Sequence, residues 1–187
     1  MEKYVVEIEP VTLKGDRTHY NVTNNGDGKN LIITESLMEA TQVFREQKRT
    51  YTEGYRDYSI NLMSGEWDEE AEEFEYLDTR MSYNYFKYLD DLYDKIGAQD
   101  IEDIKWDYEK SQIGSAKYVI AEEILKERFG EHFEEAADLI VRSKYYNMRE
   151  ICQAAGVSYQ TWRKFKCGSQ KMSLKKINAI DKTMSMV

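Results

Sequence analysis

Polar and apolar residues alternate along several short segments of the N-terminal half, which is the pattern of strands that bury one face. These segments are residues 4–9, 19–22 and 58–63, and a short apolar segment at residues 31–33 is expected to form a further strand. Residues that favour tight turns separate or end them, at 14–16, 24–28 and 64–65. The pattern predicts a small antiparallel sheet before about residue 80.

A helical pattern lies between the segments 31–33 and 58–63. Ser36 and Glu39 have the spacing of a capping box, in which a hydroxyl and a carboxylate bond to the first free backbone N–H groups of a helix. Leu37, Ala40 and Phe44 then recur at helical intervals. We therefore expect a helix over about residues 37–49, which makes this part of the chain an α+β unit.

From residue 83 onward the apolar residues recur with the period of a helix. The first stripe consists of Tyr85, Phe86, Leu89, Leu92, Tyr93 and Ile96, and Gly97 ends it. Shorter stripes predict helices near residues 101–108, 118–125 and 133–141, and Gly130 ends the second of these. Tyrosine is frequent, with 15 in the chain. The stripes fit a packed core with hydroxyl groups at the surface, or a platform on which single-stranded nucleic acid stacks.

Residues 151–168 read ICQAAGVSYQTWRKFKCG, and their spacing is that of a helix-turn-helix. Ala155 is small where two helices would cross, and Gly156 permits the positive φ of a tight turn. Ser158 follows as the expected N-cap of the next helix. The positions expected to point inward are Val157, Trp162 and Phe165. A last helix over about residues 173–184 would support the pair.

The outward face of the second helix in this motif is polar. In the major groove, Gln can form two hydrogen bonds with adenine, and Arg can form two with guanine. Gln160 and Arg163 are therefore the candidate base-reading residues, and the neighbouring Lys residues are candidates for phosphate contacts. The complete set of candidate DNA-binding residues is Ser158, Tyr159, Gln160, Arg163, Lys164, Lys166 and Lys171.

The same segment resembles the Xre/Cro/C1 family of helix-turn-helix domains, whose pattern runs apolar, small, polar, apolar, Ala, Gly, apolar, Ser. Residues 151–158 here read ICQAAGVS, and Gly168 closes the second helix. The resemblance covers about the last quarter to third of the chain, and it implies binding of double-stranded DNA. Cys152 stands where Ala is usual, and Trp162 stands where an aliphatic residue is usual.

The chain is thus predicted to be α+β. A small N-terminal antiparallel sheet with a helix precedes a mainly helical region that ends in a helix-turn-helix domain. We expect an acidic α+β domain over residues 1–80, a helical connecting region over residues 81–130 and the DNA-binding domain over residues 131–187.

Charge differs strongly between the two ends of the chain. Residues 142–187 hold ten basic and two acidic residues, a net charge of +8. Because the whole chain carries −9, the first 141 residues carry −17. One end is therefore attracted to polyanions while the other is repelled by them. Two separate tasks are expected.

The densest acidic run lies at residues 68–75, where six carboxylates occur in eight residues. It fits a solvated helix face or loop. It also fits an acidic surface that imitates a phosphate backbone and docks on a basic protein. A metal site is the weakest of the three interpretations, because no His, Cys or fixed Asp spacing supports it. The candidate partner-binding residues are Trp67, Asp68, Glu69, Glu70, Glu72, Glu73 and Phe74.

Other functional classes find little support in the sequence. Gly26-x-Gly28 lacks the third Gly and the strand-to-helix context of a dinucleotide fingerprint, and no nucleophile motif is present, so we expect neither an enzyme nor a cofactor. Cys152 and Cys167 are expected to be free thiols, and with two His they make no zinc site. The sequence has no run of about 18 apolar residues and no secretory signal pattern, so we expect a cytoplasmic protein without membrane contact.

The string WRKFKxG at residues 162–168 and the segment 172–179 are also similar to the helix-turn-helix part of certain anti-CRISPR proteins of Firmicutes phages. In those proteins such a domain is joined to another that blocks a Cas9-type nuclease. The resemblance implies a phage or mobile-element protein that binds DNA and inhibits a Cas nuclease or another basic protein. The alternative is an Xre-type transcriptional repressor whose N-terminal region senses a ligand or forms a dimer. We expect a homodimer, because such domains commonly read inverted repeats.

Overall fold

The computed structural model of the chain describes residues 18–24, 29–68, 70–71 and 73–187. It divides into two compact units, Met1–Asp91 and Leu92–Val187. The boundary falls inside a helix, α2 (Tyr85–Gly97). The expected strand at residues 4–9 and the turn at 14–16 lie outside the described residues, as does the turn at 24–28 apart from its first residue.

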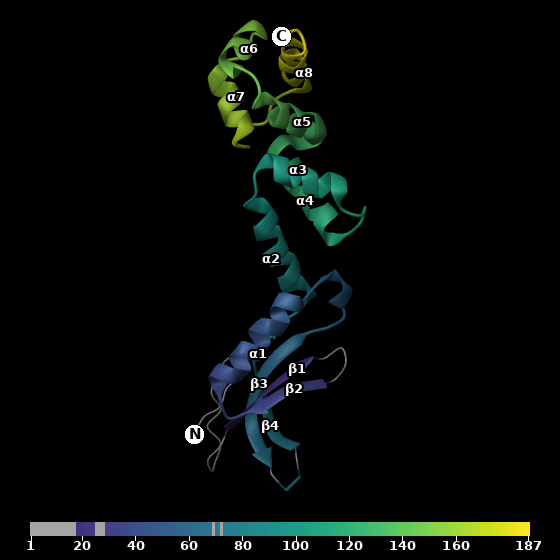
Figure 1. Cartoon of the computed structure of the whole chain (residues 1–187), viewed down its shortest axis with the longest axis vertical. Helices are drawn as coiled ribbons and strands as arrows, with labels where there is room; N and C mark the ends of the chain where they lie inside the picture. The colour runs from purple at the N-terminus through teal and green to yellow at the C-terminus, as the bar shows by residue number, and fades with distance from the viewer. Residues whose placement is uncertain (1–17, 25–28, 69, 72) are drawn as a thin grey trace. The chain divides into compact units, whose positions relative to one another are not determined.

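The N-terminal unit contains a four-stranded antiparallel sheet in the order β2-β1-β3-β4 (Figure 1). Its strands are β1 (Thr18–Asn24), β2 (Lys29–Thr34), β3 (Ile60–Asp68) and β4 (Glu73–Tyr83). The predicted strands at residues 19–22, 31–33 and 58–63 correspond to β1, β2 and the first part of β3. The α+β class is confirmed.

Helix α1 (Leu37–Thr50) packs against β1, β2 and β3. Ser36 caps the helix as predicted, because its Oγ accepts a hydrogen bond from the Glu39 N–H at 3.2 Å. The Glu39 carboxylate accepts instead from the Thr34 hydroxyl, at 2.5 Å. A short 3-10 turn, η1 (Glu53–Tyr55), follows. The buried core between helix and sheet consists of Ala40, Phe44, Tyr51, Ile60, Leu62 and Tyr83.

The turn predicted at Ser64 and Gly65 is wrong, because both residues lie in the interior of β3. This strand is paired on both sides: Gly65 lies opposite His19 of β1 and Leu77 of β4. Ser64 is fully buried, and its Oγ accepts a hydrogen bond from Nε of the buried Arg80 at 2.9 Å. A local turn signal is therefore overridden by pairing with two neighbouring strands.

The helices predicted after residue 83 are confirmed. They are α2, α3 (Ile101–Lys110), α4 (Ala116–Phe129) and α5 (Phe133–Ser143), with a 3-10 turn, η2 (Gly130–His132), before α5. Phe86 was expected on the apolar stripe of α2, but its side chain is 75% exposed, and Tyr88 packs against the N-terminal core instead. In the described part of the chain, no helix is both long and apolar enough to cross a membrane.

The last three helices are α6 (Met148–Ala154), α7 (Tyr159–Lys166) and α8 (Leu174–Met184). Helix α6 packs against α7 and α8, and α5 packs against α8 (Figure 1). Their shared core includes the buried residues Leu139, Ile151, Trp162, Phe165, Ile177 and Ile180. The predicted helix-turn-helix is therefore present, and the inward positions Val157, Trp162 and Phe165 are buried as expected.

Candidate nucleic-acid interface

The turn between α6 and α7 is built on Gly156, which has φ of +68°. Its N–H donates to the Gln153 carbonyl at 3.2 Å, and the Val157 N–H donates to the Cys152 carbonyl at 2.9 Å. These two bonds form the closing pattern that glycine at the end of a helix favours. Val157 is buried directly after the turn, so the direction in which α7 leaves is fixed by packing as well as by the backbone.

Ser158 begins α7 as its N-cap, and this role occupies its hydroxyl. The Ser158 Oγ accepts a hydrogen bond from the Thr161 N–H at 3.1 Å and lies 2.8 Å from the Thr161 Oγ1. Capping by Ser contributes about 1 kcal/mol to helix stability. Among the candidate DNA-binding residues, the side chain of Ser158 therefore already has a structural task.

The far end of α7 is closed by Gly168, with φ of +73°. The Gly168 N–H donates to the Phe165 carbonyl and the Ser169 N–H to the Lys164 carbonyl, each at 2.9 Å. A Cβ atom on Gly168 would lie 3.2 Å from Cγ of Arg128, so this end of α7 meets α4 closely. The same two helices also meet through Phe129 and Phe165, whose ring centroids are 5.4 Å apart.

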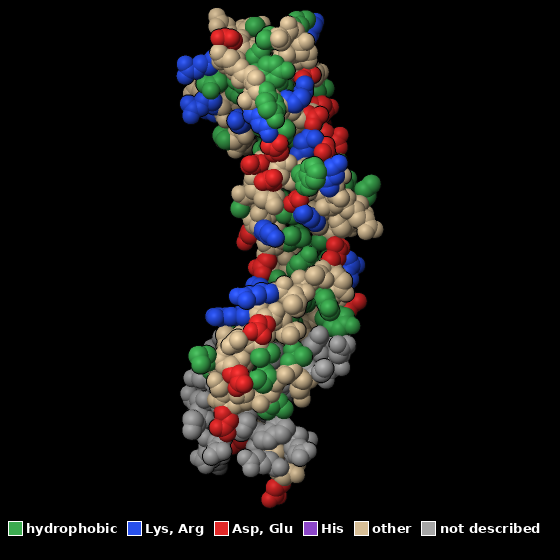
Figure 2. Space-filling model, viewed as in Figure 1, with side chains coloured by type: hydrophobic (Ala, Val, Ile, Leu, Met, Phe, Trp, Pro, Cys, Tyr) green, Lys and Arg blue, Asp and Glu red, His purple; other side chains and the backbone are tan. Residues whose placement is uncertain are grey.

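The outward face of α7 carries five of the candidate residues, and all of them are exposed: Tyr159, Gln160, Arg163, Lys164 and Lys166. They form one wall of a groove of about 920 Å³. The other wall is formed around the junction of α5 and α6, by Ser143, Lys144, Tyr146, Asn147, Met148 and Arg149. In Figure 2, Lys and Arg side chains project from the region of α6 and α7, whereas Asp and Glu side chains gather over the region of α5.

The basic side chains of α7 are not neutralised by ion pairs within the described part of the chain. Among the described residues, no carboxylate forms an ion pair with Arg163, Lys164 or Lys166. Some other cations of this unit do form ion pairs, as Arg142 does with Asp181, 2.5 Å apart. An unpaired cation beside a groove can bind a phosphate without first breaking an internal ion pair.

Lys171 lies apart from the other candidates. Its side chain is exposed, but it does not line the groove. The aliphatic part runs beside Gly130 at the end of α4, where a Cβ on that glycine would lie 3.5 Å from Cδ of Lys171. The structure thus brings Tyr159, Gln160 and Arg163 together with two of the lysines, but not with Lys171.

The second wall of the groove was missed in the sequence. It includes Lys144, Tyr146, Asn147 and Arg149. Lys144 and Arg149 belong to the basic stretch that begins at residue 142, so charge alone could have nominated them. Their position opposite α7 depends on the angle between α6 and α7, which no local pattern encodes.

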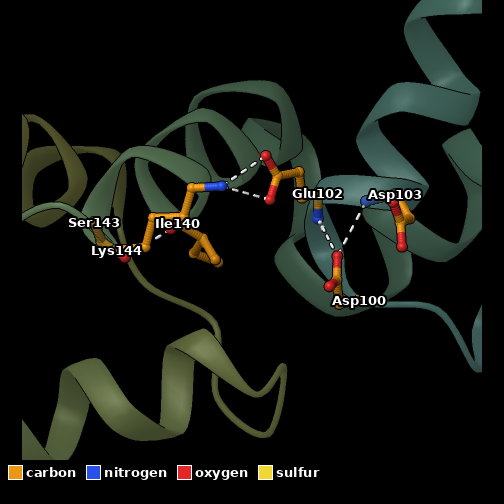
Figure 3. A network of polar contacts seen from close by, with 6 residues as sticks. All are labelled: Asp100, Glu102, Asp103, Ile140, Ser143 and Lys144. Atoms are coloured by element: carbon orange, nitrogen blue, oxygen red, sulfur yellow. Dashed lines mark hydrogen bonds and ion pairs between the residues drawn. The ribbon is translucent and has the colours of Figure 1, made fainter.

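Lys144 is tied to the acidic helix α3 (Figure 3). Its Nζ donates to both carboxylate oxygens of Glu102, at 2.7 and 2.6 Å, and this raises the pKa of the ammonium group. Asp100 caps α3 by accepting hydrogen bonds from the N–H groups of Glu102 and Asp103. One cation of the groove is therefore held by an internal carboxylate.

Cys167 also lines the groove, and its thiol differs from that of Cys152. Cys167 is exposed, and its Sγ lies 3.2 Å from the Ser169 hydroxyl. Hydrogen bonding from Ser169, helped by the nearby Arg163, lowers the pKa of the Cys167 thiol. Burial raises the pKa of the Cys152 thiol. Both cysteines are free, as expected.

The described residues of the acidic run belong to the end of β3, to a turn at 70–71 and to the start of β4, so of the solvated helix face or loop that was expected, the helix is wrong. Asp68 accepts hydrogen bonds from the N–H groups of Ala71 and Glu70, at 3.0 and 2.7 Å, and they lower its pKa. Glu70 is exposed. The side chains of the remaining candidates, Trp67, Glu69, Glu72, Glu73 and Phe74, lie outside the described part. Among the described residues, no cluster of His, Cys, Asp and Glu could hold a metal ion.

Comparison with known proteins finds no match: no family model, no curated protein and no solved structure matches the chain. The function is therefore inferred from the groove, the charges around it and the helices that position them.

Proposed function

We propose that the C-terminal unit binds double-stranded DNA by placing α7 in the major groove. The observation that carries this proposal is the division of α7 into two faces. Trp162 and Phe165 bury one face, while the other exposes Gln160, Arg163 and two lysines with no carboxylate partner in the described part of the chain. A helix held in this way presents its polar side chains at fixed positions to a duplex.

The exposed side chains suit different parts of DNA. Gln160 and Arg163 lie three residues apart and therefore on the same side of α7. An amide and a guanidinium group can each form two hydrogen bonds with a base edge, so these two residues are proposed to read sequence. Lys164 and Lys166 carry compact charges at the end of the helix and are proposed to contact phosphates.

Fluorescence anisotropy with a selected operator duplex and a random duplex tests this proposal. Arg163→Ala should cost about 1–3 kcal/mol on the operator and reduce the preference for it over random DNA. Lys164→Ala should weaken both duplexes about equally. Lys110→Ala is the matched control, because Lys110 belongs to the same unit but lies against Trp106, 5.2 Å from the ring centroid. The proposal fails if the wild-type chain binds no duplex at low salt.

We further propose that the acidic N-terminal region docks on a basic protein, most specifically a Cas9-type nuclease. The support is the net charge of −17 over residues 1–141 and the placement of its densest run on a hairpin. A surface of this charge competes with nucleic acid for a positively charged channel. A repressor that uses the same region for dimerisation or ligand sensing would not depend on such a channel.

Cleavage of a plasmid target by Cas9 nucleases, with the chain in excess, separates these possibilities. Changing Glu69, Glu70, Glu72 and Glu73 together to Lys should abolish inhibition, because like charges would then meet. The matched control changes four exposed acids elsewhere, Asp103, Glu123, Glu131 and Glu135, and should retain inhibition. If several nuclease orthologues cleave the plasmid fully in the presence of the wild-type chain, the inhibitor proposal fails and the repressor is the remaining alternative.

A further inference from the structure

Arg149 and Tyr159 contact one another at the lining of the groove proposed to bind DNA. Arg149 lies in the first turn of α6, and Tyr159 is the first residue of α7. The Cζ atom of Arg149 lies 5.2 Å from the centroid of the Tyr159 ring, a distance typical of a cation–π contact. Both side chains line the groove and are exposed.

The stability of α6 does not explain this placement of Arg149. A cation in the first turn of a helix is disfavoured by the helix dipole, which favours cations in the last turn. Among the described residues, no carboxylate forms an ion pair with Arg149, and the neighbouring Glu150 accepts a hydrogen bond from Asn147 instead. A cation–π contact at an exposed site is weak. Within the described part of the chain, the Tyr159 ring is therefore the partner that the structure gives the guanidinium group.

We propose that Tyr159 is a positioning residue that holds the Arg149 guanidinium against a DNA phosphate. This inference rests on the proposed DNA binding by α7. It assigns the ring of Tyr159 to orienting the cation rather than to contact with a base. The phenolic hydroxyl has no part in it, because the π face alone attracts the cation.

A positioning role predicts an effect that a base contact would not produce. Each phosphate contact made by a cation steepens the dependence of affinity on salt, by about 0.9 in the slope of log K against log salt concentration. Tyr159 is uncharged, so a direct contact by its ring would leave that slope unchanged. If the ring instead orients Arg149, its removal should reduce the slope as the loss of Arg149 does.

The test compares salt slopes of duplex binding for the full-length chain and four variants: Arg149→Ala, Tyr159→Ala, Tyr159→Leu and Tyr159→Phe. Relative to wild type, the Arg149→Ala, Tyr159→Ala and Tyr159→Leu slopes should each be shallower by about 0.9. Their affinity deficit should therefore shrink about eightfold for a tenfold rise in salt. Tyr159→Phe should match the wild type, since it keeps the ring face. Tyr159→Leu keeps apolar bulk, which separates loss of the ring face from loss of packing.

The double variant Arg149→Ala, Tyr159→Ala should bind no more weakly than Arg149→Ala alone. A wild-type slope in Tyr159→Ala and Tyr159→Leu would overturn the positioning role while leaving DNA binding intact. A loss of affinity in Tyr159→Phe equal to that in Tyr159→Ala would overturn it as well, by assigning the contact to the hydroxyl. Absence of duplex binding by the wild-type chain would remove the proposed function and this inference together.

Discussion

The two thiols of this chain differ in a way that chemistry can detect. Cys167 is exposed with a lowered pKa, whereas Cys152 is buried with a raised one. The thiolate is the reactive form of cysteine. At neutral pH, which lies below the ordinary pKa of a thiol, a lower pKa increases the fraction of thiolate. We therefore expect iodoacetamide at neutral pH to alkylate Cys167 alone. Peptide mass spectrometry identifies the labelled cysteine, and labelling in denaturant provides the control.

Duplex DNA should slow this alkylation, because Cys167 lines the groove. Ser169→Ala should also slow it in the absence of DNA, by removing the hydroxyl that stabilises the thiolate. Equal labelling of Cys152 in the folded chain would contradict the difference in burial.

Glu102 is expected to restrain DNA binding by holding Lys144. Glu102→Gln frees this ammonium group at the groove, so affinity for any duplex should rise, but only modestly because the ion pair is exposed to solvent. Asp103→Asn removes the same charge from the adjacent residue without touching Lys144 and should raise affinity less. Binding titrations at low salt measure both. The gain should disappear when Lys144→Ala is added; a gain that persists would mean that Lys144 has no part in it.

At the scale of elements, the two glycines that flank α7 allow a quantitative comparison of the turns before and after this helix. Both Gly156 and Gly168 have positive φ, which costs other residues about 1–2 kcal/mol. A Cβ on Gly156 would meet no atom within 4 Å, so Gly156→Ala should lower the free energy of unfolding by that backbone cost alone. Gly168→Ala should lower the free energy of unfolding further, because its Cβ would crowd Cβ and Cγ of Arg128. The Arg128 guanidinium donates a hydrogen bond to the Gly97 carbonyl at 2.6 Å, which limits how far the side chain can move.

Urea unfolding measures both free energies. Gly54→Ala is the matched control, since Gly54 lacks positive φ and a Cβ there would make only an ordinary contact, at 3.7 Å. An equal decrease in the free energy of unfolding for Gly156→Ala and Gly168→Ala would show that the Arg128 side chain moves aside without an energetic penalty.

The elements that could be predicted from the sequence are those whose ends carry local signals. Ser36, Gly130 and Ser158 each mark a helix boundary within a few residues of chain, and each is found at that boundary. Ser64 and Gly65 also carry a local turn signal, but their strand neighbours lie far away in the chain, so pairing was not visible. The same limit explains why one wall of the groove was predicted and the other was not.

At the scale of the whole molecule, the charge division does not coincide with the two compact units. Residues 92–141 hold thirteen acidic and six basic residues, so the acidic region continues into the unit that carries α7. Lys144 with Glu102 and Arg142 with Asp181 are ion pairs within this unit. The homodimer expected from the sequence stays a prediction.

The folding unit for DNA binding is therefore expected to begin near residue 92 rather than at the start of the basic stretch. A fragment of residues 92–187 should bind duplex DNA as the full chain does. A fragment of residues 142–187 lacks all but the last two residues of α5, including the buried Leu139 and Ile140, and should not fold. Circular dichroism and binding titrations of both fragments provide the measurement. If the fragment of residues 142–187 is helical and binds duplex DNA as the full chain does, α5 is not needed for folding or binding.

The C-terminal unit combines −7 in residues 92–141 with +8 in residues 142–187, so it is almost neutral while its ends are strongly charged. Such a body is a large electric dipole. For the proposed DNA binding, we expect the field of the polyanion to exert a torque that turns the α6–α7 side toward the nucleic acid before any contact forms. On the same proposal, the acidic helices would repel DNA that approaches from their side, so a larger share of collisions is expected to begin with α7 facing the duplex.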